Sequence, residues 1–376
     1  MDLGSRFFGR VICLMALTGA GWGQNPALGK TAYRDESPYI PGGRPVFLTL
    51  PSAKLAPGEI PARSQVPLWS GSFSYNGTAY SYSMVGTNPA SGSATTSIPL
   101  VIIPLEFVFA DGTTLSATQT VCGDTADAVM RVVDSPLIAK AFRFAPGGAN
   151  LGTTQYIDAF QRANFWSIVS GAAPNYHVLF SPVLTEPVQT VTVLHIDGKT
   201  VAGPCSRIGE VEFNFFDGVA QSLIKKLGIA ASQLPVFLDY NSFLTAGGCC
   251  IEGYHAVTAS DQTYAMAVYS DPGIFRLPIE DIHALSHELG EWVDDPFGNN
   301  MVPAWGHVGQ VGGCQSNLEV GDPLTGHDFT ATLNGFTYHP QDLVFLPWYA
   351  RSSPSTSVNG WYTFMNEFAK PPKLCQ

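Results

Sequence analysis

The residues best suited to chemistry lie in one segment, residues 278–296. It carries His287, Glu288 and Glu291, with one helical turn between the histidine and the second glutamate. On a helix, His287 and Glu291 lie on the same side and can hold one ion, whereas Glu288 lies at the edge of that side. We therefore predict that His287 and Glu291 bind a divalent metal. Glu288 is the catalytic group expected to accept a proton from water.

The same spacing is a variant of the His-Glu-x-x-His helix of the zincins, with Glu291 where the second histidine stands. A carboxylate oxygen is an accepted zinc ligand, so Zn²⁺ is the expected ion, with another divalent metal left open. The alternative is an amphipathic surface helix. Its apolar side would pack on the core, and its His and Glu side chains would merely be solvated. The apolar residues there are Ile282, Leu285, Leu289, Trp292 and Val293.

Two neighbours extend the polar side of this helix. His283 lies one turn upstream of His287 and would add a ligand, although a zincin helix already supplies its full share with two residues. Asp295 precedes Pro296, where a carboxylate is typical of a cap or a turn.

A third ligand has to come from another segment, and residues 317–323 offer the best candidate. In the gluzincin class, a glutamate from a later segment completes the metal site, and a following carboxylate orients the ligand histidine from behind. We assign the first role to Glu319 and the second to Asp322. The alternative is that both carboxylates organise a turn around Gly321.

The remaining histidines are less specific. We expect His255 to line the active site as a catalytic hydrogen-bond donor, the other interpretation being a buried structural residue. His307, His327 and His339 lie in the loop-rich C-terminal part, and their spacing selects none of them as a ligand.

Three runs together carry a resemblance: residues 285–296, 317–323 and 249–255. They resemble a family of exported bacterial zincin-like proteins, and the Ser-His-Glu-x-x-Glu core is also distantly similar to the plant Exordium-like, phosphate-induced extracellular proteins. The resemblance covers about residues 66–376. It implies a metallopeptidase-like fold, and Glu291 is the position at which the chain departs from the zincins.

The elements that must position these residues alternate between strand and helix without a strict βαβ repeat. This order favours an α+β domain with a mixed sheet, an active-site helix and an irregular C-terminal subdomain. A hairpin is predicted at Asn76-Gly77. Further strands are predicted at residues 98–109, 177–180, 188–195 and 234–240, and helices at residues 124–142, 154–169, 219–227 and from Pro278 to Asp295.

The chain divides into three parts. Residues 1–23 have the positive start and the short apolar stretch of a secretory signal peptide, so we expect a secreted, extracellular or periplasmic protein. Residues 24–65 are rich in Pro and Gly and predict an extended arm laid over the surface. Residues 66–376 are expected to form a single zincin-like domain, of which residues 297–376 are the loop-rich subdomain.

The charge pattern excludes two classes of partner. The net charge is −11 and the Lys and Arg residues do not cluster, so we expect neither nucleic acid nor an anionic membrane surface as a partner. After the signal peptide, the sequence has no run of about 18 apolar residues, so membrane insertion is not expected.

These features predict a secreted metal-dependent hydrolase, most simply a zinc metallopeptidase acting on a peptide or protein. The alternative is a non-catalytic extracellular protein that binds a metal or a glycan, with Trp348-Tyr349 and Trp361-Tyr362 as aromatic pairs able to stack on sugars. A glycosidase using Glu288 and Glu291 fits less well, because both residues lie on one helix rather than across a cleft. A serine hydrolase is disfavoured because the chain has no Gly-x-Ser-x-Gly motif.

The expected export also leads to a prediction about the cysteines. We expect at least two disulfides among the six cysteines that follow the signal peptide, because an oxidising compartment favours them and each typically stabilises the fold by about 2–4 kcal/mol. Counting free thiols under denaturing conditions tests this, and four or more would contradict it. The six are Cys122, Cys205, Cys249, Cys250, Cys314 and Cys375.

Overall fold

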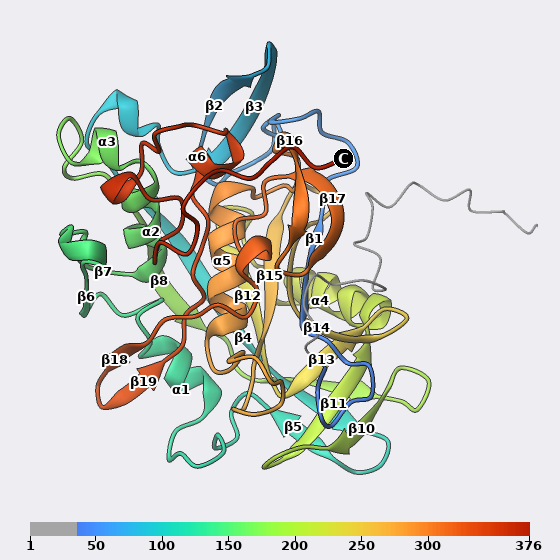
Figure 1. The fold of residues 1–376 in the computed structure, drawn as a ribbon. Coiled ribbons are helices and arrows are strands. Elements are labelled where there is room, and N and C mark those ends of the chain that lie inside the picture. Colours follow the sequence, from blue (N-terminus) through green and yellow to red (C-terminus); the bar gives the residue numbers. More distant parts are fainter. Residues whose placement is uncertain (1–35) are drawn as a thin grey trace, which may run out of the picture.

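One sheet with apolar side chains on both faces organises the chain. The computed structural model describes residues 36–376, so the expected signal peptide and the start of the arm lie outside the described residues. A curled, mixed sheet forms the centre, with helices on either side, and the class is α+β as the sequence predicts (Figure 1). Its strands are β1 (Val46–Leu50), β4 (Thr95–Phe109), β5 (Thr114–Ser116), β8 (His177–Thr185), β9 (Gln189–Val193), β10 (Gly198–Ala202), β11 (Arg207–Glu212), β12 (Leu234–Tyr240), β13 (Ser242–Thr245), β14 (Cys249–Val257) and β15 (Thr263–Tyr269).

The strand order brings distant segments together. The path is β10-β11-β13-β14-β15-β12-β4-β5, and β8 and β9 also pair with β4. β12 is parallel to both of its neighbours, whereas β14 is antiparallel to β13 and β15. β13 pairs with the start of β14, and β1 pairs in parallel with the rest of that edge. A strand from the expected N-terminal arm is thus part of the sheet.

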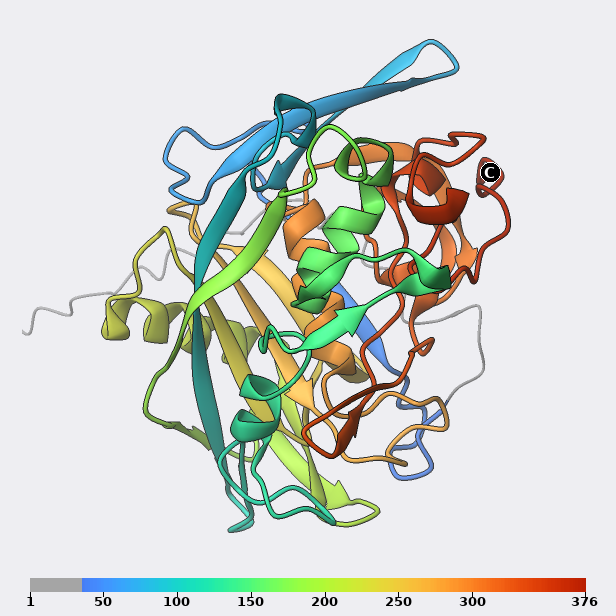
Figure 2. The same ribbon diagram turned by 90° about the vertical axis from the view of Figure 1, so that its left-hand side faces the viewer.

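The two faces of the sheet carry separate apolar cores. Along β4, Leu100 and Ile102 belong to the core shared with α2 and α5, and Val101 and Ile103 to the core shared with α4. This alternation explains why the segment reads as a continuously apolar run. Figure 2 shows α4 on one side of the sheet and α2 and α5 on the other. These helices are α2 (Tyr156–Asn164), α4 (Phe213–Leu227) and α5 (His283–Asp294).

Smaller elements surround this framework. Two-stranded ribbons and short helices lie around the sheet, some before α5 in the sequence and some after it. Within residues 36–376, no helix is long and apolar enough to cross a membrane. The small elements are β2 (Leu68–Tyr75), β3 (Thr78–Val85), α1 (Ala128–Val133), β6 (Phe142–Phe144), β7 (Gly152–Thr154), α3 (Trp166–Val169), β16 (Met301–Val308), β17 (Val311–Asn317), β18 (Ala331–Leu333), β19 (Phe336–Tyr338) and α6 (Leu346–Tyr349).

Strand predictions agree better with the structure than helix ends do. The expected hairpin is β2–β3 with Asn76-Gly77 at its turn, and β12 has the predicted bounds. The helix predicted over residues 124–142 is wrong in length, because α1 begins after the Asp127 cap and ends at residue 133, just before the Ser135-Pro136 step that a helix does not readily cross. α4 begins at Phe213, six residues earlier than expected, where the Glu212 carboxylate accepts a hydrogen bond from the Phe215 N–H.

The helix of the metal motif also begins later than predicted. α5 starts at His283 rather than near Pro278. Asp281 has φ 46° and donates its N–H to the Ser270 carbonyl, so this stretch pairs with the end of β15 instead of joining the helix.

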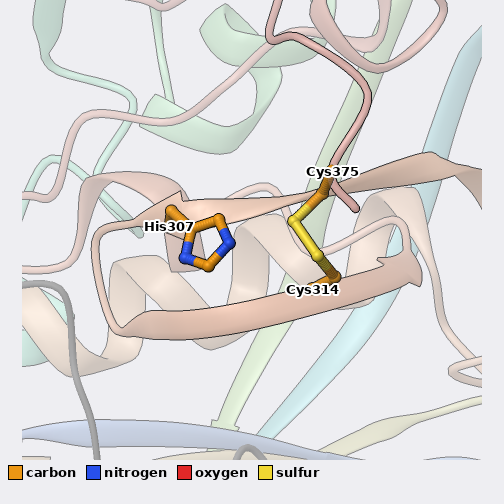
Figure 3. Close-up of side chains that lie close together, drawn as sticks. All are labelled: His307, Cys314 and Cys375. Carbon is orange, nitrogen blue, oxygen red and sulfur yellow. A yellow bond between two sulfur atoms is a disulfide. The ribbon is translucent and has the colours of Figure 1, made fainter.

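All six cysteines of residues 36–376 lie in three pairs at disulfide distance: Cys122–Cys205, Cys249–Cys250 and Cys314–Cys375. The pairing agrees with the expectation of at least two disulfides. Cys249 and Cys250 pair with each other, although neighbouring side chains on a strand ordinarily point to opposite faces. Cys314–Cys375 joins the C-terminal tail to β17, with His307 beside it (Figure 3).

A buried carboxyl group in the C-terminal segment makes the stability of the fold depend on pH. Asp342 accepts hydrogen bonds from the Thr363 hydroxyl and the Met365 N–H, and burial raises its pKa to about 7. In the unfolded chain, this carboxyl has a pKa of about 3.9. Between the two values the native chain holds a proton that the unfolded chain has lost, so this group makes the fold less stable as the pH rises from about 4 to about 7.

We therefore expect Asp342→Asn to gain stability relative to the wild type over this pH range, by about 1.4 kcal/mol per pH unit. Urea unfolding at several pH values measures the difference, with the exposed Asp134→Asn as the control. A difference between variant and wild type that stays constant with pH would contradict the assignment.

Candidate metal centre

α5 is completely buried, which overturns the alternative of a solvated surface helix. It packs against β14 and β15 and against α2 and β3, so its polar side also faces protein. Glu288 lies directly on β14 at Gly253, where an added Cβ would come within 2.8 Å of the Glu288 Oε1 atom. Glycine at this strand position therefore lets the carboxyl group approach the sheet.

The ring of His287 is fixed by a glutamine from the C-terminal segment. His287 Nδ1 lies 2.9 Å from Gln341 Oε1, while Gln341 Nε2 donates to the Gly321 carbonyl at 2.6 Å. Because the amide oxygen can only accept, Nδ1 carries the proton and Nε2 carries a lone pair. Gly321 is also in close contact with this ring, since an added Cβ would lie 2.4 Å from Nδ1.

The lone pair of His287 points at two carboxyl groups. Nε2 lies 3.1 Å from Glu291 Oε1 and 3.7 Å from Asp322 Oδ1, and it has no hydrogen-bond partner in the described structure. One ligand atom from each of these three residues lies within 4.8 Å of the others. Lone pairs that face one another at such distances repel unless a proton or a cation lies between them. The arrangement therefore fits a cation site.

His255 forms a second group on the other side of Glu291. Its Nε2 lies 3.2 Å from the Asp295 carbonyl oxygen, so Nε2 carries the proton and Nδ1 a lone pair. Nδ1 lies 3.2 Å from Glu288 Oε2 and 3.8 Å from Glu291 Oε2. Glu291 thus directs one carboxyl oxygen toward each histidine. His255 joins the predicted site, but its side chain is buried and does not line an open cleft.

The predicted segment after β17 supplies two carboxyl groups. Asp322, expected behind the ligand histidine, is the one that faces the His287 lone pair. Asp322 reaches the His287 lone pair and also accepts a hydrogen bond from Gln315 at 2.9 Å. Glu319 lies against Glu291, and its Oε2 accepts a hydrogen bond from the Thr49 hydroxyl at 2.8 Å. The geometry makes Asp322 the better third ligand, whereas ligation by Glu319 stays a prediction.

Electrostatics set a strict condition on this cluster. Its five carboxyl groups belong to Glu288, Glu291, Asp295, Glu319 and Asp322, and burial first, then mutual repulsion, raises the pKa of each well above its ordinary value. Burial likewise lowers the pKa of both histidines to about 3. No Lys or Arg of residues 36–376 forms an ion pair with any of the five. Neutrality therefore requires either bound protons or a bound cation.

The donor set suits a divalent metal. Neutral imidazole and carboxylate oxygen are accepted ligands of Zn²⁺, and a hydrogen bond on the other ring nitrogen is the usual outer support of a ligand histidine. Two buried atoms of the cluster, His287 Nε2 and Glu288 Oε1, have no hydrogen-bond partner in the described structure. These are the atoms that a cation or a water molecule beside it would engage.

The other predicted candidates belong to neither group of ligand atoms, although Asp295 is one of the five carboxyl groups of the cluster. His283 is buried next to the Phe47 ring, with 6.2 Å between ring centroids, and belongs to neither group of ligand atoms. Asp295 caps the turn after α5, as expected, by accepting the N–H groups of Asn299 and Asn300. His339 Nδ1 lies 2.7 Å from Asp281 Oδ2, away from His287.

Sequence reasoning missed the residues that support and cover the site. Gln341 orients His287, Gln310 donates to Asp322, and Thr49 donates to Glu319. None of them belongs to a motif, because each reaches the cluster through tertiary packing from a distant segment. The proline-rich composition around residue 49 was the only available signal, and it indicated an arm rather than a contact.

The comparisons with known proteins leave this geometry as the basis for assigning a function. No family model, no curated protein and no solved structure matches the chain.

Proposed function

We propose that this protein is a secreted metal-dependent hydrolase with a zincin-like fold, most simply a peptidase. His287, Glu291 and Asp322 would hold the ion, Zn²⁺ being the first choice, with Glu319 next to Glu291. One observation carries the proposal: the unprotonated His287 Nε2 faces two carboxyl oxygens and has no donor.

The proposed hydrolysis uses the cation together with Glu288 and His255. A divalent cation in this site would polarise a scissile carbonyl group and lower the pKa of water. Glu288 would accept the proton of that water; the absence of a hydrogen-bond partner at its Oε1 in the described structure supports this role. The oxygen of the deprotonated water would bond to the carbonyl carbon. The proton, shared between Glu288 and His255 Nδ1 at 3.2 Å, would then pass to the amine when the C–N bond breaks.

A structural ion is the second candidate, and the burial of the site favours it. A closed site filled by protein ligands is typical of structural metals. Glycan binding through the two aromatic pairs has less support, because Trp348, Tyr349 and Tyr362 are buried in the core. A glycosidase also fits poorly, since Glu288 and Glu291 both lie on α5.

Metal content tests the ligand assignment. We expect the purified wild type to contain a divalent metal, which His287→Ala should abolish because it removes the nitrogen ligand. Gln341→Ala should lower the affinity by about 10–100-fold, because it frees the ring that Gln341 orients. Elemental analysis and zinc titration measure both, with the exposed His307→Ala as the control.

Asp322→Asn and Glu319→Gln then identify the third ligand. We expect the larger loss of affinity for Asp322→Asn. A metal-free wild type, or equal affinity of the wild type and His287→Ala, would contradict the site.

Glu288→Gln separates the enzyme from the structural protein. The amide keeps the shape of the side chain but cannot accept the proton, so metal content should persist while peptide hydrolysis falls by about 10²–10⁴-fold. Glu252→Gln is the matched control, since Glu252 is equally buried on β14 and outside both groups of ligand atoms. If the metal-loaded wild type cleaves no peptide of a broad library, before or after release of its N-terminal segment, the structural ion is the better assignment.

A further inference from the structure

A strand from the N-terminal segment covers the metal centre. β1 forms parallel pairs with β14, the strand that carries His255 and Gly253. In this register, Phe47 lies opposite Gly253 and Thr49 opposite His255. Because β1 takes the edge of β14 next to the site, it occupies backbone positions with which any extended chain could pair.

The side chains of β1 contact the site residues directly. The Phe47 ring stacks on the His287 ring, with centroids 3.8 Å apart and an interplanar angle of 17°. Two positions further on, the Thr49 hydroxyl donates to Glu319. The segment therefore closes the site with the same alternate side chains that an extended ligand would present to it.

A single glutamine links the backbone of β1 to the cluster. Gln310 Oε1 accepts the Phe47 N–H at 2.7 Å, and Gln310 Nε2 donates to the Phe47 carbonyl at 3.0 Å and also to Asp322. One side-chain amide thus recognises both backbone groups of one residue and holds them beside a proposed metal ligand. The Phe47 carbonyl is therefore bonded to the Gln310 amide and does not point at the ligand atoms.

We propose that this edge of β14 is the binding site for an extended polypeptide substrate with a large apolar side chain at the position of Phe47, and that residues 44–51 occupy it as an intramolecular cover. The inference rests on the proposed function and names its substrate class. The loop that follows β1, residues 51–67, has exposed residues such as Lys54 and Arg63. Hydrolysis of one peptide bond in this loop would leave the cover attached to the fold by non-covalent contacts alone.

Two variants of the intact chain test the cover in the metal-free state. Gln310→Ala removes the amide that holds Phe47, whereas Gln315→Ala removes a different donor to Asp322 and leaves β1 untouched. Diethyl pyrocarbonate modifies accessible histidines, and mass spectrometry measures its rate at His287. We expect at least a tenfold faster reaction in Gln310→Ala than in Gln315→Ala or the wild type. Equal rates would overturn the role of β1 as a displaceable cover.

Severing the loop tests the binding site itself. A protease recognition sequence inserted after Arg63 allows one defined cut, and the same sequence in the Asn76-Gly77 turn is the control. After the cut at residue 63 and gel filtration, His287 should become reactive, and a synthetic peptide of residues 43–52 should bind and protect it again. The peptide with Phe47→Ala should bind at least tenfold more weakly, because it loses the buried ring. A cut chain that keeps His287 protected, or one that binds both peptides equally, overturns the proposal.

Hydrolysis by the zinc-loaded chain separates this inference from the proposed function. If the cut chain binds the peptide but hydrolyses nothing, the binding site is supported and the hydrolase function is contradicted. If the intact chain hydrolyses peptides as fast as the cut chain, the hydrolase function is supported and the role of β1 as a cover is contradicted.

Discussion

Negative charge without a cationic side chain is the constraint on which this structure depends. Removing one carboxylate from water is costly, and five such groups are buried together around α5. Hydrogen bonds from Asn299, Asn300, Thr49 and Gln315 relieve part of that cost. The remainder has to be offset by protons or by a cation, so the fold and the occupancy of the site are thermodynamically linked.

The framework makes sense as a way of bringing these groups together from distant segments. The sheet provides β14 with His255, α5 provides His287, Glu288 and Glu291, and the irregular C-terminal part provides Asp322. Two glycines, Gly253 and Gly321, allow the strand and the loop to approach the helix side chains closely. The loop-rich segment after α5 therefore contributes to the site rather than only packing against the domain.

The parts that sequence predicts are those determined by local spacing. His287 and Glu291 share one helix, so their proximity follows from 3.6 residues per turn, and the α+β class follows from the alternation of strand-like and helix-like segments. The burial of α5, the tautomer of His287 and the choice between Glu319 and Asp322 depend on contacts between segments far apart in the chain. Pairing of β1 with β14 spans about two hundred residues, and composition carries no signal for such a contact.

Burial of the site is compatible with catalysis because one part of its enclosure is a short edge strand, β1. The centre of α5 is covered by β14, β15 and α2, which are parts of the main core. The cover over His287 is instead a five-residue strand at the edge of the sheet, in which Val46 and Phe47 are buried and Leu48, Thr49 and Leu50 are only partly buried. Opening a short edge strand exposes fewer buried side chains than separating α5 from the sheet, so it costs less free energy. If the site opens as proposed, β1 is therefore the part of its enclosure that can move without separating α5 from the sheet.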